Sequence, residues 1–133
     1  MGLAGIVVLA VDDDVDALRL LSDILEAAGA SVTTVSSAER ALEKLQSERP
    51  MVLVSDLGMP GMDGFELIKQ VRQLSDPELR AIPAAALTAY ARSNDRAKSM
   101  RSGFEMHLAK PIEPAELIAA VGALARRHAR LDR

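Results

Sequence analysis

The chain has 133 residues, a formal net charge of −3 and 26% charged residues, which is typical of one soluble domain and not of a clearly basic nucleic-acid-binding surface. It contains no cysteine, which excludes a disulfide framework, a cysteine zinc site and a cysteine nucleophile. No apolar run approaches the roughly 20 residues that a transmembrane helix needs. We therefore expect a cytoplasmic protein without membrane contact: a single domain over 1–133, with its core at about 5–127 and a basic tail at 128–133.

The first part of the chain predicts two strand–helix units. Residues 6–11 are a continuous apolar run, which is typical of a strand buried on both faces. Apolar residues recur at helical spacing over 15–28, and a β-branched run at 31–35 predicts the second strand. Ser37 is then a candidate N-cap for a helix over 37–48.

The same alternation continues to the end of the chain. The remaining predicted elements, in order, are a strand at 51–55, a helix at 65–74, a strand at 82–87, a weaker helix at 93–102, a strand at 104–109 and a helix at 115–127. Five βα units predict an α/β fold with a five-stranded parallel sheet and helices on both faces. Because crossovers are right-handed, the sheet should be doubly wound.

Polar side chains follow four of the predicted strands at the point where each strand ends. Asp12 and Asp13 follow the first strand, Asp56 the third, Thr88 the fourth and Lys110 the fifth. Ligands of doubly wound sheets bind at this carboxyl edge, so we expect these side chains to converge. Converging carboxylates repel each other, so either the pKa of one of them rises or a cation binds, and an oxygen-only ligand set suits Mg²⁺. A carboxylate nucleophile beside a metal and a lysine is an arrangement suited to accepting a phosphoryl group.

Four elements taken in order resemble the receiver domain of two-component response regulators. They are Val11-Asp12-Asp13, the stretch D-L-G-M-P-G-M-D-G over 56–64, Leu87-Thr88-Ala89 and Lys110-Pro111. The match covers about 5–127. The resemblance implies a flavodoxin-like (βα)5 sandwich and a phosphorelay function, in which the domain catalyses only its own phosphorylation and dephosphorylation and turns over no separate substrate.

By matching position, the resemblance implies that Asp56 is the phosphoacceptor. It implies that Asp13 binds Mg²⁺ directly, that Asp12 does so mostly through water, and that the backbone carbonyl of Gly58 completes the metal ligands with Asp56. Gly58 and Tyr90 lie two residues after Asp56 and Thr88, at positions where the family tunes the lifetime of the phosphoryl group.

The resemblance also implies how the phosphoryl group is sensed. Thr88 would be the switch hydroxyl, Lys110 would pair with the phosphoryl group, and the bond to Pro111 would be cis. His107 lies three residues before Lys110, where the family often has Tyr or Phe. Its imidazole has two interpretations, a switch partner of the threonine or a buried structural histidine.

The implied phosphoryl donor is a phosphohistidine on a sensor histidine kinase or a histidine phosphotransfer protein. The resemblance further implies a monomer or a weak homodimer through the helix at 93–102, the strand at 104–109 and the last helix, without nucleic-acid binding. Residues 3–5 and 103–111 are similar to receivers at the C-terminal end of hybrid sensor histidine kinases. A free-standing single-domain regulator fits the sequence equally well.

Two other functions compete with this interpretation. A haloacid dehalogenase-type phosphatase uses similar groups but needs a second aspartate two residues after the nucleophile, where this chain has Gly58. A degenerate receiver that only binds partners would lack some of the required side chains. Asp14 has a simpler role, because an aspartate directly before a helix usually caps it.

Overall fold

Five short apolar segments form one parallel sheet in the computed structural model, which describes residues 2–89 and 101–131. The strands are β1 (Val7–Val11), β2 (Ser31–Val35), β3 (Val52–Asp56), β4 (Ala84–Thr88) and β5 (Met106–Ala109). Their order is β2-β1-β3-β4-β5, and every pair is parallel. The strand order reverses at β1 and β3, so the carboxyl ends of these strands flank the position where such sheets bind ligands.

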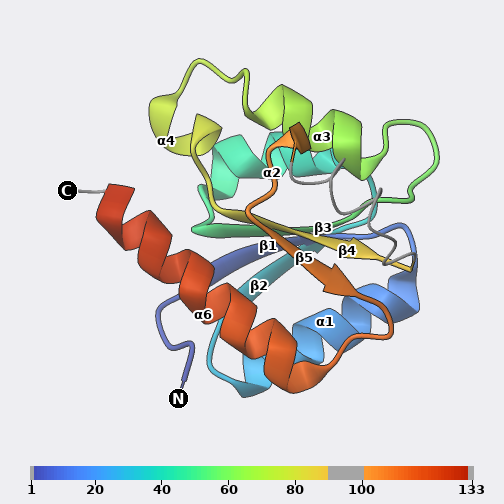
Figure 1. Cartoon of the computed structure of the whole chain (residues 1–133), viewed down its shortest axis with the longest axis vertical. Helices are drawn as coiled ribbons and strands as arrows, with labels where there is room; N and C mark the ends of the chain where they lie inside the picture. Colours follow the sequence, from blue (N-terminus) through green and yellow to red (C-terminus); the bar gives the residue numbers. More distant parts are fainter. Residues whose placement is uncertain (1, 90–100, 132–133) are drawn as a thin grey trace.

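Helices cover both faces of the sheet, as Figure 1 shows. They are α1 (Val15–Ala27), α2 (Ala38–Glu48), α3 (Gly64–Val71), α4 (Pro77–Arg80) and α6 (Pro114–Leu131). Helices α2, α3 and α4 lie on one side of the sheet, whereas α1 and α6 lie on the other. The predicted doubly wound fold is confirmed, and the predicted strand ends differ from the observed ones by no more than two residues. Within the described residues, no helix combines the length and the apolar character that crossing a bilayer requires.

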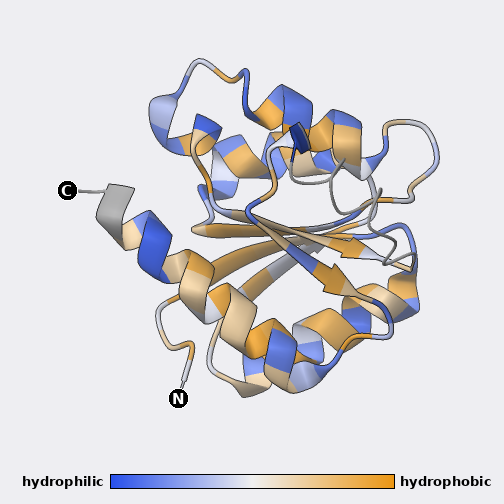
Figure 2. Cartoon of the chain, viewed as in Figure 1, coloured by the Kyte–Doolittle hydropathy of each residue, from blue (hydrophilic) through white to orange (hydrophobic). Residues whose placement is uncertain are grey.

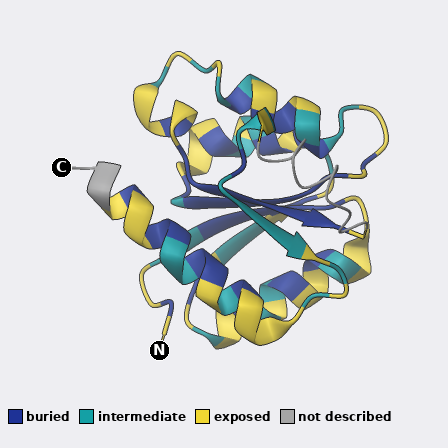
Figure 3. Ribbon diagram, in the orientation of Figure 1, coloured by how far each residue is buried: buried dark blue, intermediate teal, exposed yellow. Residues whose placement is uncertain are grey.

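The central strands separate two apolar cores. Leu9 pairs with Leu53 and both face α2 and α3, whereas Ala10 pairs with Val54 and both face α1 and α6. Figure 2 shows the strands as the most apolar part of the fold, and Figure 3 shows β3 and β4 buried along their length while β5 is only half-buried. Burial on both faces explains why the strand sequences are continuous apolar runs.

Short polar side chains begin the helices. Asp14 caps α1, because its Oδ1 accepts hydrogen bonds from the backbone N–H groups of Asp16 and Ala17 at 3.0 and 3.3 Å. Ser37 Oγ accepts one from the backbone N–H of Arg40 at 3.2 Å and so begins α2. Both caps are confirmed. They satisfy donors that the first helical turn leaves without a partner.

The structure corrects two predicted helix ends and adds one short helix. The helix expected over 65–74 ends at Val71, and the separate helix α4 follows, which was not predicted because it spans one turn. The last helix continues past 127 to Leu131, so the expectation of a solvated tail from 128 is wrong for His128, which is buried. Its position extends the buried stripe of α6, formed by Leu117, Val121 and Leu124. Residues 93–100 of the helix predicted over 93–102 lie outside the described residues.

Candidate functional site

The first acidic residues of the site follow β1. Asp12 is 1% exposed, and its Oδ1 accepts a hydrogen bond from the backbone N–H of Asp14 at 3.0 Å. Its own backbone N–H donates to Val35 at the end of β2 at 3.2 Å. Asp13 is exposed. The β1–α1 turn therefore presents one buried and one exposed carboxylate at the carboxyl edge of the sheet.

Asp56 is the last residue of β3 and is 6% exposed. The next residue, Leu57, continues towards β4 by donating its backbone N–H to Leu87 at 3.0 Å. Asp63 then caps α3, with its Oδ1 accepting from the Glu66 backbone N–H at 2.9 Å. The loop after β3 is thus tied to β4 on one side and to the start of α3 on the other.

Gly64 closes this loop against β3. Its N–H donates to the Leu57 carbonyl at 3.1 Å, and a Cβ placed on it would overlap the carbonyl oxygen of Asp56. Only glycine allows the helix to begin this close to the strand. The contact of Gly64 with the backbone of Asp56 was not predicted, because it depends on the tertiary fold.

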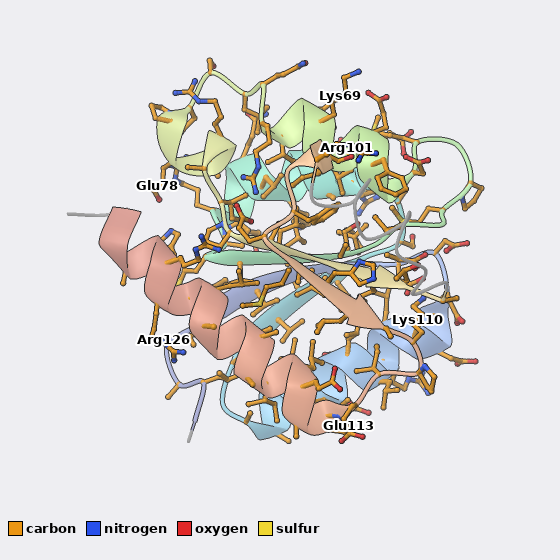
Figure 4. The ribbon with its side chains drawn as sticks, viewed as in Figure 1. Lys69, Glu78, Arg101, Lys110, Glu113 and Arg126 are labelled. Atoms are coloured by element: carbon orange, nitrogen blue, oxygen red, sulfur yellow. The ribbon has the colours of Figure 1, made fainter. Side chains whose placement is uncertain are left out.

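Lys110 joins the acids from β5. Its backbone N–H donates to Thr88 at 2.8 Å, which holds the two strand ends side by side. Its Nζ lies 2.9 Å from Asp12 Oδ2 and 3.0 Å from Asp56 Oδ1. Figure 4 shows Lys110 at the edge where the strands end, whereas Glu78 lies at the opposite end of the sheet. The predicted convergence of the strand-end residues is therefore present.

Burial and charge act in opposite directions on these groups. Burial raises the pKa of Asp56 above its ordinary value, the hydrogen bond from Lys110 partly offsets this, and the neighbouring charges of Asp12 and Asp13 raise it further. Burial by itself would lower the pKa of Lys110, but the hydrogen bonds to Asp12 and Asp56 outweigh it, so that this pKa is raised. The lysine therefore stays cationic and partly neutralises the acid cluster.

The three carboxylates form a set that fits a hard cation. One oxygen from each of Asp12, Asp13 and Asp56 can be chosen so that all lie within 4.8 Å of one another. They face a cavity of about 530 Å³, which Gly58 also lines without filling it, since nothing lies within 4 Å of where its Cβ would be. Oxygen donors without histidine or cysteine are the ligands that Mg²⁺ prefers.

Comparison with known proteins identifies the family to which this arrangement belongs. A family model described as the response regulator receiver domain matches residues 8–122. The chain belongs to the response regulator receiver family. It is therefore a receiver domain of the two-component type, a signalling module, and its acidic pocket fits the phosphoacceptor site of that family.

Three relatives of different length illustrate the similarity. An uncharacterised 14.6 kDa protein of Leptolyngbya boryana is 52% identical over 119 residues, covering 90% of this chain and 89% of that protein. The alkaline phosphatase synthesis transcriptional regulatory protein PhoP of Bacillus subtilis is 36% identical over 90% of this chain, which spans only 48% of PhoP. The chemotaxis response regulator CheY4 of Vibrio cholerae superposes with a TM-score of 0.82 at 32% identity, covering 90% of this chain and 98% of CheY4.

The receiver brings most of the sequence-predicted site residues into one cavity. Its lining comprises Asp12, Asp13, Asp14, Asp56, Leu57, Gly58, Asp63, Phe65, Thr88, Ala89 and Lys110. The cis bond between Lys110 and Pro111 is confirmed. His107 is half-buried on β5 and is not part of the lining, and Tyr90 lies outside the described residues.

Five lining residues were not predicted as part of the site: Asp14, Leu57, Asp63, Phe65 and Ala89. Asp63 and Phe65 come from the start of α3. One signal in the sequence could have identified them: they lie directly before and after Gly64, and this glycine brings the start of α3 against the end of β3.

Proposed function

We propose that this receiver accepts a phosphoryl group on Asp56 in the presence of Mg²⁺, and that the modified state changes its interaction with a partner. The observation that carries the proposal is the placement of Lys110, whose Nζ lies 2.9 and 3.0 Å from two carboxylates that follow different strands. A cation held against two buried acids beside an open cavity suits the binding of an incoming anionic phosphoryl group.

The metal ligands in this proposal are the carboxylates of Asp12, Asp13 and Asp56 and the backbone carbonyl of Gly58. The carboxylate cluster and the position of Gly58 in the same cavity support this assignment. When bound, Mg²⁺ neutralises carboxylate repulsion and supplies positive charge for the transferring phosphoryl oxygens. Metal binding requires ionised carboxylates, and the raised pKa of Asp56 opposes that ionisation.

In the transfer step, an oxygen of Asp56 attacks the phosphorus of a phosphohistidine in line with the bond to the imidazole nitrogen. The new O–P bond forms as the P–N bond breaks, and the donor imidazole leaves with the bonding electrons. Lys110 exchanges a carboxylate partner for a phosphoryl oxygen, and the Thr88 hydroxyl, at the end of the neighbouring strand, donates a hydrogen bond to another.

Receiver domains interact with histidine kinases or histidine phosphotransfer proteins, and we assign this chain a donor of that class in the cytoplasm. The new charge on Asp56 favours the state in which Thr88 and Lys110 contact the phosphoryl group, and the difference in contact energy shifts the population. A homodimer through the helix at 93–102, β5 and α6, and a switching role for His107, stay predictions.

The cavity lacks a group that the phosphatase alternative requires. A haloacid dehalogenase-type enzyme would use an acid two residues after the nucleophile, and Gly58 has no side chain at that place. The degenerate-receiver alternative is equally disfavoured, because the lysine and all three carboxylates are present in one cluster.

The test is direct labelling of the protein. With Mg²⁺ and acetyl phosphate, the intact mass should rise by about 80 Da, the mass that a phosphoryl group adds. Asp56→Asn, or removal of the metal, should abolish the gain. Asp63→Asn is the matched control. It removes another carboxylate of the same cavity, but asparagine can still cap α3, so this variant should still be labelled. Labelling of Asp56→Asn would refute the proposal.

A further inference from the structure

Arg72 forms a hydrogen-bonded junction far from the acidic cavity. It is the C-cap residue of α3, and every nitrogen of its guanidinium group is a donor. Nη1 donates to the carbonyls of Arg80 and Ile82 at 2.8 and 2.6 Å. Nε and Nη2 donate to the carbonyl of Gly103 at 3.1 and 2.7 Å, and Nη2 also lies 3.1 Å from Glu105 Oε1. A planar fork of five N–H groups is needed to reach these acceptors together.

Glu105 extends this junction into the sheet. Its Oε1 accepts a hydrogen bond from the backbone N–H of Ala84 at 2.8 Å, and its backbone N–H donates to the Ala84 carbonyl at 2.9 Å. Ala84 is the first residue of β4, and Glu105 directly precedes β5. Glu105 therefore holds the beginning of β5 against the beginning of β4, and Arg72 in turn holds the Glu105 side chain.

Gly103 brings the chain over the Arg72 side chain. Its φ of +119° lies in the region that favours glycine, and a Cβ there would come within 3.0 Å of Arg72 Cγ. The arginine is itself largely buried: burial lowers the pKa of its guanidinium, and the charge of Glu105 partly offsets this. Removal of Arg72 would leave several carbonyls and one carboxylate without these donors, which is costly for groups shielded from water.

β5 lies at an edge of the sheet, where a strand is held by a single neighbouring strand. It has four residues, is half-buried, and within the described part of the chain pairs only with β4. The register pairs Ala85 with Met106 and Thr88 with Ala109, and Lys110 follows at once. A slip of one residue would move Lys110 by about 3.3 Å and turn its side chain to the other face of the sheet.

We infer that Arg72 is a positioning residue for phosphoryl transfer: by clamping Gly103 and Glu105, it sets the β4–β5 register that places Lys110 against Asp56. This inference rests on the proposed function. Asp12, Asp13 and Asp56 follow β1 and β3, to which the hydrogen bonds of Arg72 do not extend. Loss of these hydrogen bonds should therefore displace the Lys110 side chain and leave the carboxylate cluster in place.

The test is Arg72→Lys, which keeps the charge but not the fork. The Kd for Mg²⁺, measured by calorimetry, should not rise above that of the wild type, because the carboxylates stay in place and a displaced lysine competes less for their oxygens. The rate of labelling by acetyl phosphate should fall between about tenfold and a hundredfold, as misplacement of a reacting group by an ångström can cause. In a Lys110→Ala background, the same substitution should slow labelling no further.

A local structural signal separates positioning from general destabilisation. In Arg72→Lys, amide hydrogen exchange should accelerate at Lys110, whose N–H bonds to Thr88, and stay unchanged at Met51, whose N–H bonds to Val7 in β1. Glu105→Gln is a milder second variant, since its amide oxygen can still accept from Ala84, and it should fall between the wild type and Arg72→Lys in labelling rate.

Arg49→Lys is the matched control. Arg49 forms ion pairs with Asp76 and Glu78 but none with the residues around β5 within the described ranges, so labelling should stay at the wild-type rate. If the wild type itself is not labelled, the proposed function fails. If the wild type is labelled and Arg72→Lys matches it, or if Arg72→Lys slows labelling equally in the Lys110→Ala background, only the positioning role is overturned.

Discussion

Lys110 and Asp12 are 98 positions apart in the sequence, yet Lys110 Nζ lies 2.9 Å from Asp12 Oδ2. The same ammonium group is 3.0 Å from Asp56 Oδ1. The lysine is thus the counter-ion of two buried acids. A divalent cation would compete with it for these oxygens, and a phosphoryl group would draw it away from them.

This competition predicts that replacing Lys110 strengthens Mg²⁺ binding but slows phosphorylation. In Lys110→Met, Mg²⁺ should bind more tightly, because the acids lose their internal cation, while the rate of labelling by acetyl phosphate should fall by about a hundredfold, a typical loss for a group that stabilises transition-state charge. Calorimetry and timed intact-mass measurements check the two arms. Weaker Mg²⁺ binding together with unchanged labelling would contradict the assigned role of the lysine.

Asp13 should decide metal binding without contributing to the lysine contacts. It is exposed, and the ion pairs of Lys110 involve Asp12 and Asp56 instead. Excess Mg²⁺ should stabilise the wild type by about 2–3 kcal/mol at roughly a hundred times its Kd. Asp13→Asn should lose most of this gain in thermal unfolding, whereas Asp16→Asn on the first turn of α1 should keep it. Equal gains in both variants would exclude Asp13 as a ligand.

Ionised Asp56 should destabilise the metal-free fold. Its folded-state pKa is raised from 3.8, chiefly by burial, so the folded protein holds this proton more tightly than the unfolded chain does. Its contribution to stability is full below the unfolded pKa and is lost as pH rises through the folded pKa. With a chelator at neutral pH, Asp56→Asn should therefore unfold about 2–4 °C higher than the wild type, the shift that a modest stabilisation produces.

The pH dependence provides the control for that prediction. The advantage of Asp56→Asn should shrink as pH falls below 3.8, where the wild-type carboxyl is protonated in both states. Unfolding midpoints measured across this range check the sign. An advantage that grows on acidification would contradict the assignment of the raised pKa to Asp56.

Two glycines of the same loop should respond differently to alanine. Gly64→Ala would place a methyl group into the Asp56 carbonyl and should cost about 1–3 kcal/mol of unfolding free energy or more, the usual price of overpacking. Gly58→Ala is the matched control, because its Cβ would enter open space and stability should change little. Urea unfolding of both variants measures the two changes in unfolding free energy. Equal losses would contradict the conclusion that the close approach of Gly64 to the Asp56 carbonyl leaves no room for a side chain.

Local signals explain which helix boundaries could be predicted. Asp14 was predicted as a cap because a cap depends on a few neighbouring residues. The helix α4 was missed because its four residues are too few to show a hydrophobic period. His128 was misplaced because its burial depends on α6 continuing along the sheet, and a basic composition at a chain end gives the opposite indication.

The sequence by itself determined the alternation of strands and helices and the identity of the strand-end residues, because periodicity and motif order are local properties of the chain. Only the tertiary structure decided that Lys110 contacts both Asp12 and Asp56, that Gly64 has no room for a side chain, and that Arg72 anchors β5. These relationships join segments that only the parallel sheet brings together, and their distances follow from strand order and register, which hydrophobic pattern alone does not specify.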